Sequence, residues 1–283
     1  MVRIVADSTS NLPKELTDKY GIEVVPLRVI FPGGTTYRDG VEITTGEFYR
    51  MMAASPMLPT TSQPPAAEFE DVFARLTASG DEVLAIVISG YLSGTLASAV
   101  AAQRSLAPAK ITVFDSLAAA APVAFMVLRA AERAAAAASV QEIMADLEIL
   151  RARMQMLFVV DTLEYLQKGG RIGGAAALAG SLLRIKPILT IKEGRVDAWG
   201  KVRGKRKALQ LAIEATAQHV GTGPSVRAAV MHAACEQEAR EFGEQVMSAL
   251  GCPAPPLSEL SPVLGVHVGP GTLAVAAYNE QWL

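Results

Sequence analysis

Short, mainly apolar runs recur through the first half of the chain, and they constrain its fold more than any other feature. Residues 2–6, 83–88 and 111–114 form the clearest runs, and a stretch of helical character follows each of them. Strands that are apolar on both faces need cover on both faces, which is typical of a parallel sheet flanked by helices. We therefore expect an α/β fold that begins with a Rossmann-like domain built on a parallel sheet.

The second half of the chain predicts a separate, mixed sheet. Glu193-Gly194 divides two strand-like runs, residues 187–191 and 196–202, and this is a hairpin signal. The other expected strands of this half are residues 157–160, 227–232, 264–268 and 273–277, and its other expected helices are residues 175–184, 205–220 and 236–250. In the first half, a strand is also expected at residues 22–31. We place the domain boundary near Met154, which gives an N-terminal α/β domain, 1–154, and a C-terminal mixed-sheet α/β domain, 155–283.

Composition narrows the class of protein. The chain has 283 residues, of which 51% are hydrophobic and 19% charged, so a sizeable core is available. Its net charge of −2 argues against a dedicated nucleic-acid-binding protein. The most apolar stretch begins at Leu117 but carries Arg129 and Arg133, so it indicates a half-buried helix and not a membrane span. With no signal peptide in view, we expect a cytoplasmic protein with two free thiols, Cys235 and Cys252.

Small hydroxyl residues cluster where the predicted strands of the first domain end. The clusters are Asp7-Ser8-Thr9, Ser89 with Ser93-Gly94-Thr95, Asp115-Ser116, and Thr60-Thr61-Ser62 just before a predicted helix. Ligands of such sheets bind beyond the carboxyl ends of the strands, where helix N-termini offer unpaired N–H groups. N-capping explains each cluster taken alone, but four clusters at one presumed edge favour a shared anionic ligand. Asp7 and Asp115 could in principle bind Mg²⁺, although a helix cap is the commoner role, and we expect no metal.

The expected anion is a carboxylate and not a phosphate. Neither glycine-rich phosphate pattern, GxxxxGK[ST] or GxGxxG, follows a strand in this chain. Burying a carboxylate is costly unless it is hydrogen-bonded, and neutral donors can supply those bonds. The candidate donors are Thr61, Ser62, Ser93 and the backbone N–H of Gly94.

Seven motifs, in order from end to end of the chain, resemble those of the DegV family. They are ADSTSNLP (6–13), TSQP (61–64), SGTLASA (93–99), LEYLQKGGRIG (163–173), LLRIKPILTIKEG (182–194), KVRGKRKAL (201–209) and VHVGPGTLA (266–274). None is specific alone, but the set is. The family includes the fatty-acid-binding subunits of bacterial fatty acid kinase.

The resemblance implies a function and a set of roles. A long-chain, palmitate-like fatty acid would lie buried between two α/β domains, with its carboxylate held by Thr61 and Ser93. His267 resembles the family histidine near that head group, and Arg171 resembles a residue needed for phosphorylation of the lipid. The partner would be a separate ATP-binding kinase protein, which converts the carboxylate to an acyl phosphate. No cofactor is implied beyond the bound fatty acid, and the chain would be a lipid carrier, not an enzyme.

The chain also departs from the family pattern. Gly90-Tyr91 stands where a second Ser or a Lys is frequent, and Val268 replaces a threonine. After Asp115-Ser116, an Ala-rich stretch replaces the Gly and Gln of the family. These differences bear on chain-length preference and partner choice.

The tail requires an apolar lining. Burial of each methylene contributes about 0.8 kcal/mol to the binding free energy. A sixteen-carbon tail would therefore contribute roughly 10 kcal/mol, before the entropy lost in ordering the tail is subtracted. The candidate lining, which we predict only as a group, is Leu27, Val29, Phe125, Met126, Leu128, Leu163, Leu166, Leu178, Leu182, Leu183 and Ile188. His219 and His232 are interpreted as structural or surface residues.

Two other classes of function stay open at this point. One is a stand-alone hydrolase, an esterase or phosphatase, that uses Ser93, although YLSGT lacks the GxSxG elbow. The other is a nucleic-acid-associated regulator that acts through the basic run from Lys201 to Lys207. That run is usually a solvated helix start, but it could also dock a partner kinase or make a transient contact with membrane head groups.

Overall fold

A computed structural model describes residues 1–178 and 185–283 of the chain, which form two compact units. The first unit comprises Met1–Thr44 and Pro59–Ala152, and the second comprises Thr45–Leu58 and Arg153–Leu283. The segment Thr45–Leu58 thus belongs with the C-terminal part of the chain, whereas the expected domains were continuous. Each unit is described by itself.

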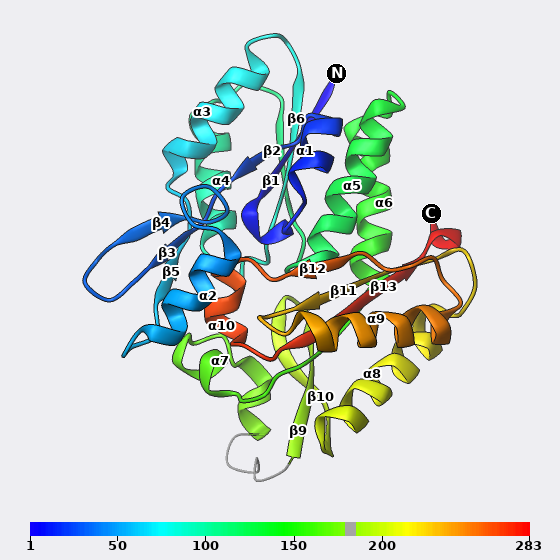
Figure 1. The fold of residues 1–283 in the computed structure, drawn as a ribbon. Coiled ribbons are helices and arrows are strands. Elements are labelled where there is room, and N and C mark those ends of the chain that lie inside the picture. The colour runs from blue at the N-terminus through cyan, green and yellow to red at the C-terminus, as the bar shows by residue number, and fades with distance from the viewer. Residues whose placement is uncertain (179–184) are drawn as a thin grey trace. The chain divides into compact units, whose positions relative to one another are not determined.

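The first unit is built on the expected parallel sheet. Its strands are β1 (Val2–Asp7), β2 (Glu23–Val25), β6 (Glu82–Val87) and β7 (Ile111–Asp115), in the order β2-β1-β6-β7. All three pairings are parallel. The helices of this unit are α1 (Lys14–Tyr20), α3 (Ala66–Thr77), α4 (Thr95–Ser105), α5 (Ala121–Ala135) and α6 (Val140–Arg153), with a 3-10 turn at Ser8–Ser10. Figure 1 shows α3 and α4 on one face of the sheet and α5 and α6 on the other.

The predicted continuous runs are buried on both faces, as the parallel sheet requires. Val5, Ala85 and Val87 are fully buried, and they pack with Phe69 and Phe73 of α3 in one core cluster. The alanine-rich stretch forms α5, seven of whose residues are buried, so the prediction of a half-buried helix is confirmed. Among the described residues, no helix has the length and apolar character needed to cross a membrane.

The single strand expected at residues 22–31 is wrong. Pro26 follows β2, and the chain then enters β3 (Arg28–Ile30), which belongs to a different sheet. This small antiparallel sheet also contains β4 (Thr36–Arg38) and β5 (Thr60–Ser62), in the order β4-β3-β5. A proline has no N–H to donate, so it favours a break in strand pairing at this point.

The second unit contains a six-stranded mixed sheet in the order β10-β9-β8-β13-β11-β12. Its strands are β8 (Gln155–Val159), β9 (Ile185–Lys192), β10 (Arg195–Arg203), β11 (Val226–His232), β12 (Leu257–Glu259) and β13 (Leu273–Asn279). Only the β11–β12 pair is parallel among the pairings of these described strands. Glu193 and Gly194, with φ values of 50° and 78°, form the turn of the predicted β9–β10 hairpin.

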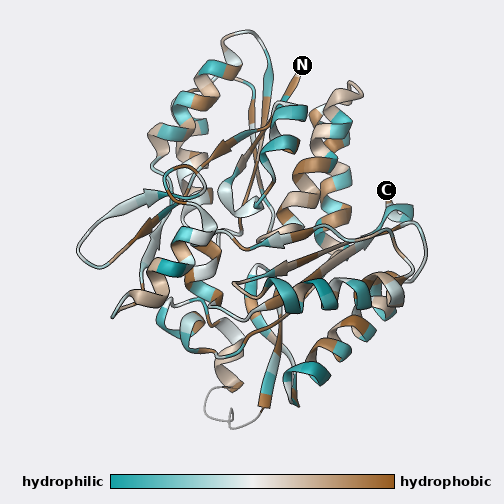
Figure 2. Ribbon diagram, in the orientation of Figure 1, coloured by the Kyte–Doolittle hydropathy of each residue, from teal (hydrophilic) through white to brown (hydrophobic). Residues whose placement is uncertain are grey.

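Helices of the second unit cover its sheet. They are α2 (Thr45–Ala54), α7 (Glu164–Lys168), α8 (Lys205–Val220), α9 (Glu236–Leu250) and α10 (Pro262–Val268), with 3-10 turns at Gly173–Leu178 and Glu280–Trp282. Buried residues of α8 and α9 share one core cluster with β8, β11 and β13. In Figure 2, the strands of this sheet are mostly hydrophobic and α9 mostly hydrophilic, which matches a helix with one buried face.

Residues 264–268, expected as a strand, lie in helix α10, so that prediction is wrong. A short apolar run does not separate a strand from a buried helical turn. The flanking residues carry the better signal: Pro262 stands in the first helical turn, and Gly269 ends the helix with a φ of 75°. The start of the helix expected at 175–184 lies in the 3-10 turn Gly173–Leu178, and residues 179–184 lie outside the described residues.

Candidate functional site

The carboxyl ends of β1, β6 and β7 bring three of the hydroxyl clusters to one edge of the parallel sheet. Asp7, at the end of β1, is fully buried and links this strand to β6. Its Oδ2 accepts a hydrogen bond from the Ile88 N–H at 2.7 Å, and its Oδ1 accepts from the Thr9 N–H at 2.8 Å. Burial raises the pKa of Asp7, and these hydrogen bonds oppose that rise. The Asp7 carboxylate is therefore used in hydrogen bonds that hold the ends of β1 and β6 together, which favours a structural role.

The Asp115-Ser116 cluster is also satisfied locally. The Asp115 carboxylate accepts hydrogen bonds from the N–H groups of Leu117, at 3.0 Å, and Gly90, at 3.3 Å. The Ser116 hydroxyl donates to the carbonyl of Ala118 at 3.3 Å. In the described part of the chain, no group of His, Cys, Asp and Glu side chains could hold a metal ion.

The Ser93-Gly94-Thr95 cluster begins helix α4. It is the candidate anion site, because some of its hydrogen-bond donors have no acceptor among the described residues. The Ser93 Oγ lies 2.8 Å from Thr95 Oγ1 and accepts the Thr95 N–H at 3.3 Å. Within the described residues, no acceptor bonds to the N–H of Gly94, the N-cap residue. Four unpaired N–H groups and a partial positive charge at a helix N-terminus suit an anion.

Strand β5 brings Thr61 and Ser62 toward this helix start. Thr61 pairs with Val29 across the small sheet, and Gln63 follows the strand. A Cβ built on Gly94 would lie 2.9 Å from the Gln63 Cδ, so the Gln63 amide packs against the Gly94 backbone. The four predicted donors Thr61, Ser62, Ser93 and Gly94 thus belong to neighbouring segments of the first unit. We call these four residues the hydroxyl cluster.

Arg171 and His267 lie in the second unit and lie close together there. The Arg171 N–H donates to the Leu166 carbonyl at 2.9 Å, and its Nη1 donates to the Gly169 carbonyl at 2.7 Å. His267, near the C-terminus of α10, packs its ring against Gly169. We call Arg171 and His267 the cationic pair, after the charge on Arg171.

Burial, and to a smaller extent the positive charge of Arg171, together lower the pKa of His267 from 6.5 to about 4. At neutral pH the imidazole is therefore uncharged, and it can donate one hydrogen bond and accept another. The arginine keeps its charge at that pH. The cationic pair therefore combines a guanidinium with a neutral imidazole that can both donate and accept a hydrogen bond.

The other histidines and the cysteines have structural surroundings. His219 is exposed, and its Nε2 lies 2.8 Å from the Arg153 carbonyl oxygen. His232 is buried at the end of β11, and burial lowers its pKa. Cys235 and Cys252 are free thiols, as expected.

The predicted tail lining divides between the two units. Six of its members are buried: Leu27, Val29, Met126, Leu163, Leu166 and Ile188. Phe125, Leu128 and Leu178 are half-buried, and Leu182 and Leu183 lie outside the described residues. Burial alone does not separate a lining residue from an ordinary core residue, so the lining stays a prediction.

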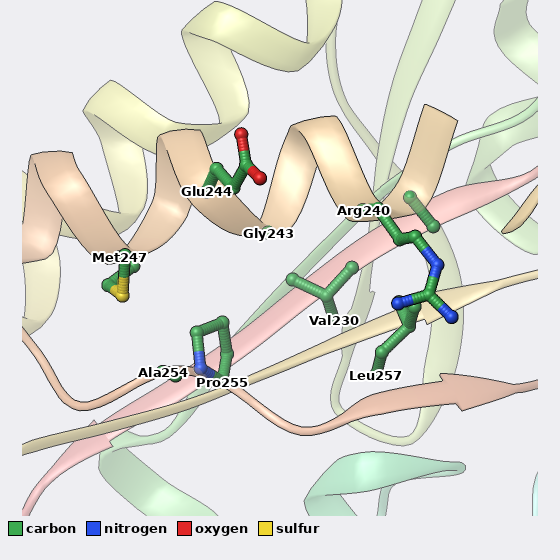
Figure 3. Close-up of a pocket in the computed structure, with 9 residues that line it drawn as sticks. Val230, Arg240, Gly243, Glu244, Met247, Ala254, Pro255 and Leu257 are labelled. Carbon is green, nitrogen blue, oxygen red and sulfur yellow. The ribbon is translucent and has the colours of Figure 1, made fainter. Parts of the chain in front are cut away.

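Two surface hollows lie apart from these residues. The one in Figure 3 has a volume of about 260 Å³ and lies between α9 and the segment leading into β12. Val230, Met247, Pro255 and Leu257 give it an apolar floor, and Gly243 of α9 leaves it open on the helix side. The other, in the first unit, includes Asp81, Leu106 and Lys110. No predicted site residue lines either hollow.

Three packing partners of the site escaped the sequence reasoning. They are Gln63 against Gly94, His267 against Gly169, and Tyr165 against Gly269. The sequence signs of these contacts are the glycines of SGT, KGGR and VGPG, since a residue without a Cβ leaves room for a neighbouring side chain.

Comparisons with known proteins place these features in context. Residues 1–280 match the sequence profile of DegV, which is described as an uncharacterised protein family. A DegV domain-containing protein of Deinococcus radiodurans is 39% identical over 275 residues, covering 97% of each chain. Protein DegV of Bacillus subtilis is 34% identical over 275 residues, covering 97% of this chain and 98% of its own.

Solved structures are similar over the same extent. A Thermus thermophilus DegV family protein described as binding fatty acid is 40% identical, with a TM-score of 0.93 and coverage of 98% of this chain and 99% of its own. The Bacillus subtilis DegV structure, described as a fatty acid binding protein, is 34% identical with a TM-score of 0.90 and the same coverage. A stearic-acid-binding protein of Eubacterium ventriosum is 30% identical, with a TM-score of 0.89 and 99% coverage of both chains.

Proposed function

The chain belongs to the DegV family, and from this premise we propose that it binds one long-chain fatty acid in a buried tunnel. The observation that carries the proposal is likeness along the whole chain to DegV structures described as fatty-acid-binding, at up to 40% identity. The ligand is a palmitate-like acid, and no cofactor is required for holding it.

We assign the carboxylate to the hydroxyl cluster. The Thr61 and Ser93 hydroxyls and the Gly94 N–H supply neutral donors, with Ser62 assisting. The Ser93 and Thr95 hydroxyls lie 2.8 Å apart and either can donate to the other; when Thr95 donates, the Ser93 proton is available for a carboxylate oxygen. Hydrogen bonds from neutral donors satisfy a buried carboxylate without bringing a second charge that would also need desolvation.

Apolar burial supplies most of the affinity in this account. About 0.8 kcal/mol per methylene yields roughly 10 kcal/mol for a sixteen-carbon tail, before the cost of ordering it. The head-group donors add specificity, since an ester or an alcohol presents fewer acceptors to the same set of N–H and O–H groups.

The cationic pair suits a later step, in which a separate ATP-dependent kinase protein phosphorylates the bound acid. A carboxylate oxygen would form a bond to the γ-phosphorus of ATP as the bond to ADP breaks, giving an acyl phosphate and ADP. A guanidinium matches the charge and geometry of the transferring phosphoryl group. The neutral His267 would hydrogen-bond the head group. The chain is then a substrate carrier in the cytoplasm, and the kinase is the enzyme.

The hydroxyl of Ser93 interacts with Thr95 in this structure, so its hydrogen bonds do not favour the hydrolase alternative, which needs a base beside the serine. The basic run from Lys201 to Lys207 is a surface on which an acidic partner or anionic head groups could dock. Lys205 contributes little to it, because it pairs with Glu238 at 2.9 Å.

The experiment that tests the binding proposal is mass spectrometry of the lipid released when the purified protein is denatured. We expect about one long-chain fatty acid per chain. If the extract holds none, and the lipid-free protein then takes up no palmitate in a calorimetric titration, the proposal is wrong. Hydrolysis of a model ester or phosphate that is lost in Ser93→Ala would instead favour the hydrolase.

A further inference from the structure

Helices α7 and α10 contact each other in the second unit (Figure 1), and each ends at a glycine. Gly169 follows the last residue of α7, and Gly269 follows the last residue of α10. Each helix places an aromatic ring against the glycine that ends the other. This reciprocal packing involves Tyr165 and His267, and we call it the α7–α10 lock.

Tyr165 of α7 packs against Gly269. A Cβ built on Gly269 would lie 2.2 Å from the Tyr165 Cδ2 and 2.5 Å from its Cε2, so any side chain there would collide with the ring. The φ of Gly269 is 75°, which also strains other residues. Two separate causes therefore require glycine at this position.

His267 of α10 packs against Gly169 in the same way. A Cβ built on Gly169 would lie 2.4 Å from the His267 Nδ1 and 3.1 Å from its Cε1. The φ of Gly169 is −76°, a value that any residue adopts. The requirement for glycine at this position comes from the space that the imidazole occupies and not from the backbone.

Gly169 also holds Arg171. Its carbonyl oxygen accepts the Arg171 Nη1 at 2.7 Å, while its Cα faces the His267 ring. The Arg171 N–H is bonded to Leu166, inside α7. A shift of α10 against α7 would therefore separate the imidazole from the guanidinium.

Helix α10 is packed just as closely against α2. A Cβ built on Gly265 would lie 2.6 Å from the Tyr49 Oη and 2.8 Å from the Phe48 Cε1, both on α2. The Tyr49 hydroxyl donates to the Leu260 carbonyl at 3.2 Å. Rings on α2 thus limit movement of α10 at Gly265, and Tyr165 limits it at Gly269.

We infer that Tyr165 is a positioning residue, whose ring fixes α10 against α7 and so holds the His267 imidazole beside Arg171. The importance of this arrangement for a bound carboxylate rests on the proposed function, but the arrangement itself does not. The Tyr165 hydroxyl makes no hydrogen bond with the part of the chain that the structure describes, so the inferred role belongs to the ring.

The test is an NMR titration of the histidines in the lipid-free protein, comparing wild type, Tyr165→Ala and Tyr165→Phe. The chain has only three histidines, so each signal can be assigned by single substitution. We expect His267 to titrate near pH 4 in the wild type. Tyr165→Ala should move its midpoint upward by about one unit or more, because water reaches the ring and Arg171 is farther away. Tyr165→Phe should leave it unchanged.

His232 reports whether the fold is kept, since burial lowers its pKa and its midpoint should not move in either variant. Gly169→Ala gives the same test from the other helix, because its methyl group would displace the imidazole while Tyr165 stays in place. Gly46→Ala is its control, since a Cβ at Gly46 meets no atom within 4 Å. If His267 keeps its midpoint in both Tyr165→Ala and Gly169→Ala, the inference is overturned.

Palmitate binding is measured separately on the same proteins. This measurement distinguishes a failure of the inference from a failure of the proposed function. An unchanged His267 midpoint in both Tyr165→Ala and Gly169→Ala overturns the lock even if palmitate binds. A wild type that shows the low midpoint but takes up no palmitate overturns the proposed function and leaves the lock supported.

Discussion

The hydroxyl cluster and the cationic pair are built by different means. In the first unit, Ser93 and Gly94 stand at a helix start, where Ser93 and Thr95 already hydrogen-bond each other. In the second unit, Arg171 and His267 are held by tight packing around Gly169. Removing one donor from the first leaves others in place, whereas one added methyl group in the second displaces a ring. We expect the first to govern affinity and the second to govern chemistry.

Arg171→Ala should separate affinity from chemistry with the largest effect. Loss of the guanidinium should lower the rate of acyl phosphate formation by about 100-fold or more, with the partner kinase and ATP present. Palmitate affinity should change less than about twofold, because neutral donors hold the carboxylate. ADP release and calorimetry measure the two quantities. Arg104→Ala, an exposed arginine on α4, is the control, and equal turnover in Arg171→Ala and wild type would exclude the role.

The lowered pKa of His267 predicts an acid-sensitive fold. The unfolded chain takes up a proton at this histidine below about pH 6.5, whereas the folded chain resists it until about pH 4. The free energy of unfolding is therefore unaffected by this histidine above pH 6.5. It decreases as the pH falls from 6.5 to about 4, by about 3 kcal/mol at most. Urea unfolding of wild type and His267→Gln across this range measures the difference. Parallel curves for the two proteins would contradict the burial of the ring.

Ser93→Ala should weaken palmitate binding by about 1–3 kcal/mol, roughly 5- to 150-fold, because one carboxylate contact is lost. The matched control is Ser105→Ala at the other end of the same helix, where the hydroxyl bonds to Glu70. Calorimetry of lipid-free protein with palmitate gives both affinities. Equal affinities of Ser93→Ala and wild type would remove Ser93 from the head-group site.

Gly243→Ala should have the smallest effect, which is a small gain in stability. Gly243 lies within α9 beside the hollow of Figure 3, and a Cβ there meets no atom within 4 Å. An alanine in an open helical position should stabilise the protein by about 0.5–1 kcal/mol. Urea unfolding measures this gain in stability. A loss of stability would mean that the space around Gly243 does not accept a methyl group.

The fold was largely predictable because strong local patterns agreed with the packing. The runs that became β1, β6 and β7 are apolar on both faces, and only a covered parallel sheet satisfies them. The failures occurred where a short run is ambiguous. Pro26 lies between β2 and β3, which belong to two different sheets. The apolar residues of α10 alone predict a strand, whereas Pro262 and Gly269 indicate a short helix.

The site was predictable only as a set of residue types. Hydroxyls at strand ends indicated donors, but local hydrogen bonds account for Asp7 and Asp115. Contacts such as Tyr165 with Gly269 join residues about a hundred positions apart and follow no period, so the sequence holds no sign of them apart from the glycine. The roles of Thr61, Ser62, Ser93, Gly94, Arg171 and His267 stay predictions.

The central claim is that neutral hydroxyls bind an ionised carboxylate, and carbon-13 NMR of palmitate labelled at its carboxyl carbon tests it most directly. The account predicts one bound carboxyl resonance, in the ionised form near neutral pH, which shifts in both Ser93→Ala and Thr61→Val and keeps its position in Ser105→Ala. A bound resonance that is identical in wild type, Ser93→Ala and Thr61→Val would contradict the claim.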